Sequence, residues 1–254
     1  MTKFISRITQ RGYSSTRTFL PGVIRILLIG SLSLMAASYF VEVAQASSGN
    51  KKPTQVSATP QTQENRIAMF NQAVANDLAG RPTAARRAYD TLKGTELDSQ
   101  IAVPSAVNFV ALGRFAEASK AFDALTLSPN VRDRDYARLW QLWLNARTGQ
   151  KAHGNKKDTV GAISLAQPNE QAIANLYTGK GSVEAVFSAV KAMSFTTELE
   201  RSDALTEATF FTGTWLLYVK HDNAAAKNLF DQNRSQLNNV SLETPFITKE
   251  MAAL

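Results

Sequence analysis

The sequence contains no cysteine, and only two of its 254 residues are histidines. Without cysteine the chain has no disulfides, thiolate nucleophile, cysteine-ligated zinc or iron–sulfur cluster. The HExxH zinc motif, the Walker A loop and the GxSxG nucleophile elbow are also missing. We therefore expect a non-enzymatic protein without a metal or another cofactor.

Three local features resemble chemical sites but have simpler interpretations. The run Gly179–Ser182 lacks the first glycine and the strand of a phosphate loop, so it is predicted to be a turn between helices. His221 belongs to a polar turn, where a histidine needs no catalytic role. The acids Glu198, Glu200 and Asp203 are typical of a solvated helix start, which favours negative charge.

The chain has little excess charge once its first residues are set aside. Residues 1–46 hold five Lys/Arg and one acid, so residues 47–254 keep a net charge of +3 out of the +7 of the whole chain. Their basic residues are scattered among acids and form no stripe. We therefore expect no nucleic-acid partner.

Residues 1–46 are predicted to be a secretory signal. Basic residues precede the apolar run Ile26–Phe40, and Ala44-Gln45-Ala46 fits the small-x-small cleavage pattern. The alternative is an uncleaved segment that anchors the protein in a membrane, since Ile26–Val41 is only slightly short of a bilayer span. Both alternatives predict an exported, extracytoplasmic protein. Residues 47–63 are rich in polar residues and contain two prolines, so they are predicted to be a disordered linker.

Residues 64–254 have the period of helices. Glycine, alanine and aromatic positions repeat at a step of 33 residues: Gly80 and Gly113, Ala85 and Ala118, Tyr89 and Phe122. The small residue lets two helices approach, and the aromatic ring fills the groove beyond it. Further helices are expected from Arg132 to Gly149, at 168–178 and 182–192, and as a final cap at Pro245–Leu254. The segment 153–157 contains a glycine and charged residues that interrupt the helical pattern.

The best-formed hairpin is Thr206–Phe230, with a polar turn at Lys220–Asn223 after a polar bend at Ser194–Ser202. Its Phe210, Gly213, Thr214, Leu217, Ala226 and Phe230 have the spacing of the tetratricopeptide (TPR) repeat. The chain therefore resembles TPR proteins, and we expect an all-α, TPR-like solenoid of four to five helical hairpins.

Residues 135–230 resemble one branch of that family, the periplasmic TPR lipoproteins of the NlpI type. The resemblance is in Leu139-Trp140 with Trp143-Leu144, in Ile173–Gly179 and in Glu207–Gly213. It implies a scaffold in the bacterial cell envelope that binds peptidoglycan hydrolases and an envelope protease. The chain departs from the family in having no lipobox cysteine, so a lipid anchor does not carry over.

Two other functions remain open from the sequence. One is an assembly or accessory factor of a secretion or pilus system. The other is an unrecognised envelope hydrolase, for which His221 or Glu207 would be the residues to substitute.

An aromatic stripe is the predicted binding surface. Phe211, Trp215 and Tyr218 lie at i, i+4 and i+7, on the helix face that lines the concave groove in TPR proteins. Large rings on such a face favour a peptide partner. The alternative is a core face covered by the final helix or by a homodimer partner. Trp140 and Trp143 leave the same two alternatives open.

Overall fold

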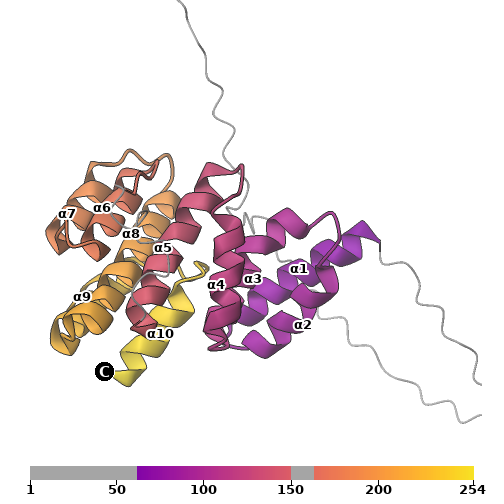
Figure 1. The fold of residues 1–254 in the computed structure, drawn as a ribbon. Helices are drawn as coiled ribbons and strands as arrows, with labels where there is room; N and C mark the ends of the chain where they lie inside the picture. The colour runs from indigo at the N-terminus through magenta and orange to yellow at the C-terminus, as the bar shows by residue number, and fades with distance from the viewer. Residues whose placement is uncertain (1–61, 150–162) are drawn as a thin grey trace, which may run out of the picture. The chain divides into compact units, whose positions relative to one another are not determined.

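The computed structural model describes residues 62–149 and 163–254 (Figure 1). All of them belong to one compact unit, Lys51–Leu254. Regular structure in the described residues is helical, with no strand, so the all-α prediction is confirmed. The predicted signal, almost all of the predicted linker and the segment 153–157 lie outside the described residues.

Ten α-helices and two short helical turns follow one another in the described residues. They are α1 (Gln63–Leu78), α2 (Pro82–Leu92), α3 (Asp98–Ala111), α4 (Phe115–Leu125), α5 (Val131–Thr148), α6 (Pro168–Tyr177), α7 (Val183–Ala192), α8 (Glu198–Trp215), the π-helical turn η1 (Leu216–Lys220), α9 (Asn223–Asn233), the 3-10 turn η2 (Arg234–Gln236) and α10 (Thr244–Ala253).

Helices that are consecutive in the chain pack against each other from α1 to α9 (Figure 1). Short turns join α1 to α2, α3 to α4, α6 to α7 and η1 to α9, which makes four helical hairpins with α5 between the second and third. The last helix, α10, departs from this order. It contacts α8 and α9 and also returns to α1, the first helix.

Three of the four hairpins share one kind of turn. Gly80, Gly113 and Gly179 have φ of 69°, 71° and 74° at the end of the first helix. The next amide in each turn bonds back to a carbonyl five residues earlier, at 2.8 Å, 2.9 Å and 2.8 Å respectively. Glycine fits because it reaches positive φ without a clash of its Cβ atom.

The predicted alanine and aromatic pairs form the joints of three hairpins. Ala85 and Tyr89, Ala118 and Phe122, and Ala226 and Phe230 are all completely buried. In the last hairpin there is no room for a side chain on the first helix at the joint, because a Cβ atom on Gly213 would lie 2.2 Å from the Phe230 ring. Only glycine therefore allows α8 and α9 to approach this closely.

The structure corrects the start of the Thr206–Phe230 hairpin. Its first helix, α8, begins at Glu198, inside the segment that we expected to be a polar bend. Thr197 caps it by accepting the Glu200 N–H at 3.1 Å, while the Glu200 carboxylate accepts the Thr196 N–H at 2.8 Å. The first bond satisfies a free amide of the first turn, and the second fixes the residue before the cap, so the helix starts eight residues before the predicted position.

The same hairpin contains a π-helical turn that the sequence pattern did not predict. After η1 the Asp222 N–H bonds to the Leu216 carbonyl, six residues back instead of five. His221 takes the place of the turn glycine with φ of 55° and is the sole non-glycine residue with positive φ among those described. One extra residue is thus accommodated before α9.

The main hydrophobic core runs from α3 to α10, and a smaller cluster joins α1, α2 and the start of α3. Trp140 is the largest fully buried side chain of the main core. None of the described helices is long and apolar enough to cross a membrane. The apolar run Ile26–Phe40 lies outside the described residues.

A candidate helix-binding groove

The five aromatic residues predicted as a binding surface come from α5, α8 and η1. Four of them meet at the centre of the structure. The Trp140 ring lies 5.6 Å from Phe211 and 5.4 Å from Trp143, and Trp143 lies 6.0 Å from Tyr218. Trp215 instead has the Lys220 ammonium 5.0 Å above its ring.

These rings are largely covered. Phe211 and Trp140 are 0% exposed, Trp143 is 3% exposed and Trp215 is 9% exposed, while Tyr218 is half-buried. The structure therefore places the first four in the core, which is the second of the two alternatives from the sequence. An open groove lined by their rings is absent from the described residues.

The helix that covers much of this face is α10. Its Phe246 lies 5.5 Å from Trp140 and 5.7 Å from Phe210, ring centre to ring centre. Ile247, the next residue, is 1% exposed. The sequence suggested the final helix as one possible cover, and in the structure that helix packs onto the aromatic face.

We define the α10 groove as the surface beneath this helix. It is formed by Tyr136 and Trp140 of α5, Phe210 of α8, and Tyr218 of η1. Helical spacing explains the alignment: Tyr136 and Trp140 are four residues apart, so both project from one face of α5.

Hydrogen bonds hold both ends of α10 in the groove. The Tyr136 hydroxyl donates to Glu243, just before α10, at 2.5 Å. Near the other end, the Tyr218 hydroxyl donates to Glu250 at 2.5 Å. The Arg147 guanidinium lies 4.9 Å above the Tyr218 ring, so the Glu250 end of the groove is also cationic.

A buried group of carboxyls lies at the Glu243 end of the groove. Burial raises the pKa of Glu170 to about 7, and it raises the pKa of Glu207 well above its usual value. The pKa of Glu243 is raised for the same reason. Arg132 opposes the shift at Glu170 and Glu207, and Asn169 donates to Glu207 at 3.0 Å.

The sequence pattern does not predict this group of carboxyls as a site. The signal was present at Glu207, because residues 206–215 are buried all around the helix, so a glutamate there must enter the interior. Glu170 and Glu243 come from distant helix starts, and sequence spacing does not bring them together. Within 62–149 and 163–254, no group of three or more His, Cys, Asp or Glu side chains is placed to hold a metal ion.

The two residues named for a hydrolase do not form one site. Glu207 is buried in α8, whereas His221 follows η1, which is roughly 20 Å further along at ~1.5 Å per residue. Gly179–Ser182 is the turn between α6 and α7, as the sequence predicted. Glu198 and Glu200 lie in the first turn of α8, as expected for helix-start acids.

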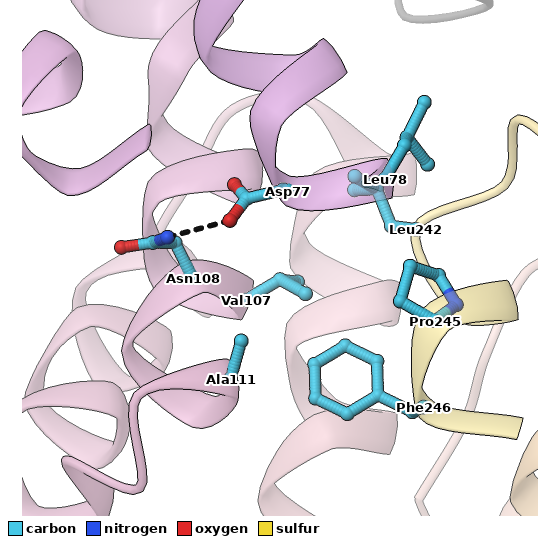
Figure 2. A pocket seen from close by; sticks show the side chains of 8 residues that line it. All are labelled: Asp77, Leu78, Val107, Asn108, Ala111, Leu242, Pro245 and Phe246. Carbon is cyan, nitrogen blue, oxygen red and sulfur yellow. Dashed lines mark hydrogen bonds between the residues drawn. The ribbon is translucent and has the colours of Figure 1, made fainter. Parts of the chain in front are cut away.

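A small hollow lies where α10 meets α1 and α3 (Figure 2). Its volume is about 20 Å³, which is room for roughly one water molecule. Its α10 side is formed by Leu242, Pro245 and Phe246. Packing between α10 and the first helices is therefore incomplete.

Asp77 is the charged residue beside this hollow. It accepts hydrogen bonds from Asn108 at 2.6 Å and from the Tyr89 hydroxyl at 3.0 Å. Burial nevertheless raises the pKa of Asp77 to about 6. These contacts tie α1 to α2 and α3, and they give the first hairpin a half-buried acid of its own.

No protein-family model matches the chain, and no curated protein matches its sequence.

Proposed function

We propose that this protein is an exported, non-enzymatic scaffold of TPR type that binds other proteins in the bacterial cell envelope. The observation that carries the proposal is the repeated joint of the hairpins. A fully buried alanine and an aromatic residue four positions later recur in α2, α4 and α9. This small-and-large packing is the feature by which TPR hairpins stack into a binding surface.

The resemblance of residues 135–230 to NlpI-type proteins supplies the proposed partners. They are peptidoglycan hydrolases and the protease that degrades them. A scaffold acts on such partners by holding two of them on one surface, which raises the effective concentration of each for the other. Catalysis by the scaffold itself is not required.

The test is site-specific crosslinking in the intact envelope. A photoreactive amino acid is placed at Val219 in η1, which is 42% exposed and next to Tyr218 of the groove. The matched control is Leu127, which is 85% exposed after α4. We expect crosslinks to hydrolases or a protease from Val219 and fewer from Leu127.

Other crosslinked partners would decide between the remaining functions. Components of a secretion or pilus machine in place of hydrolases would favour the assembly factor. Activity of the purified protein on peptidoglycan, abolished by Glu207→Gln or His221→Ala, would favour a hydrolase and contradict the proposal.

A further inference from the structure

The chain holds its own last helix in the way that a groove holds a helical ligand. Four residues of the α10 region face the groove: Glu243, Phe246, Ile247 and Glu250. Their positions are i, i+3, i+4 and i+7. This is the anchor spacing with which amphipathic helices of one protein lie in the hydrophobic groove of another.

The groove matches these anchors in chemistry as well as in spacing. Tyrosine hydroxyls of α5 and η1 each donate to one of the two acids at 2.5 Å, and aromatic rings receive Phe246 between them. Both donors would lose their acceptors if an apolar or basic segment took the place of α10. Any helix that replaces α10 must therefore offer an acid at each end and an aromatic residue in between.

Several features make α10 replaceable. It has ten residues, which is too short for a helix that is stable alone in water. Residues 237–243, which lead into it, have no helical or strand structure. The hollow under Pro245 and Phe246 shows that its fit against α1 and α3 is incomplete (Figure 2).

We propose that the α10 groove is the binding site for an amphipathic helix of a partner, with acid-x2-aromatic-aliphatic-x2-acid spacing, and that α10 is its intramolecular competitor. This inference rests on the proposed scaffold function and names the class of segment that the scaffold binds. The partner helix gains access when α10 leaves the groove, so α10 lowers the apparent affinity of the protein for its partner.

The probe for this competition is a labelled synthetic peptide of residues 241–254, used with the full-length protein. In the variant Glu250→Lys the acceptor of Tyr218 is replaced by a cation near Arg147, which weakens docking of α10 and leaves the groove residues intact. We expect this variant to bind the peptide at least 10-fold more tightly than the wild type in fluorescence anisotropy.

Two controls separate competition from a general change of charge. Lys249→Glu alters an exposed residue of α10, and we expect it to leave peptide binding at the wild-type level. Adding Tyr218→Phe to Glu250→Lys removes a donor of the groove and is expected to reverse the gain by about 10-fold. A peptide with Phe246 replaced by alanine should bind neither protein.

Glu250→Ala in the protein is the second variant, for use if Glu250→Lys fails to fold, because it removes the acceptor of Tyr218 without adding a charge. If a folded variant with a loosened α10 binds the peptide no better than the wild type, the proposal is overturned. If envelope crosslinks from Val219 persist while the peptide never binds, the scaffold function stands and the helix-binding groove falls. If Val219 gives no crosslinks to envelope proteins although the peptide binds the protein, the scaffold function is contradicted.

Discussion

The first hairpin, α1 and α2, and the last, α8 with η1 and α9, share a joint but differ in the small residue that the first helix contributes to it. Ala85 with Tyr89 and Ala226 with Phe230 occupy corresponding places in the second helix. In the first helix, the small residue is Ala73, seven residues before the turn glycine Gly80. The last hairpin has Gly213 instead, eight residues before His221.

The extra residue in the last hairpin is accommodated by η1, the π-helical turn. It changes the helical register between Gly213 and the turn, and it lies where Tyr218 reaches Glu250 of α10. π-Helical turns of this kind occur frequently at functional sites. The first hairpin thus packs in a regular way, and the last one departs from it at the place where α10 contacts η1.

The largest expected effect tests whether the joint of the last hairpin requires glycine at position 213. Gly213→Val places a Cβ atom 2.2 Å from the Phe230 ring, and the two added methyl groups lie beyond it. We expect a loss of about 3 kcal/mol in the free energy of unfolding, because overpacked cores must shift backbone or rings. The measurement is urea unfolding followed by circular dichroism.

The control for this variant is Ala73→Gly in the first hairpin. It removes one methyl group from a buried site and lowers helix propensity, for a loss of about 1 to 2 kcal/mol. A loss in Gly213→Val no larger than that in Ala73→Gly would mean that the Phe230 ring moves aside and that glycine is not required at this joint.

A second, smaller effect is the pH dependence of stability that comes from one acid in each of the two hairpins. Burial raises the pKa of Asp77 to about 6 from 3.8, so the folded protein binds more protons than the unfolded chain between these values. Stability is then greatest below about pH 4 with respect to this group, and it falls as pH rises through 6. The expected loss by pH 8 is about 2 kcal/mol, at 1.36 kcal/mol per pKa unit with allowance for partial exposure.

Variants assign this loss to one hairpin or the other. Asp77→Asn should remove one part of the fall of stability, the part that begins near pH 4 and ends near pH 6. Glu207→Gln in α8 should remove another part, which begins near pH 4.5 and extends through the raised pKa of this buried carboxyl. Urea unfolding from pH 4.5 to pH 8 measures both profiles, and an unchanged profile for Asp77→Asn would refute the role of this acid.

The sequence predicted the helices of both hairpins because their signals are local. A glycine at each turn and an alanine four residues before an aromatic ring depend on neighbours in the same hairpin, as at Gly80, Ala85 and Tyr89. The predicted cap at 245–254 also proved to be a helix, α10, with bounds that differ by one residue at each end.

What the sequence left open depends on contacts between distant segments. Phe211 belongs to the core only if another segment covers α5 and α8. The helix that covers them, α10, lies more than 30 residues later in the sequence. The grouping of Glu170, Glu207 and Glu243 likewise needs three helix positions far apart in the chain. The π-helical turn has no composition signal, since LLYVK is an ordinary apolar helix sequence.

The smallest expected effect concerns the turn itself. His221 adopts φ of 55° where the other hairpins use glycine, and this left-handed conformation costs a side-chain-bearing residue about 1 kcal/mol. His221→Gly removes that cost but adds chain entropy to the unfolded state, so we expect a net gain of roughly 0.5 kcal/mol. The reverse change at the turn of the second hairpin, Gly113→His, should lose about 1 kcal/mol, because it adds that strain to a glycine turn with φ of 71°. Thermal unfolding measures both changes, and a loss of stability in His221→Gly would show that the imidazole makes a contact that offsets its strained backbone.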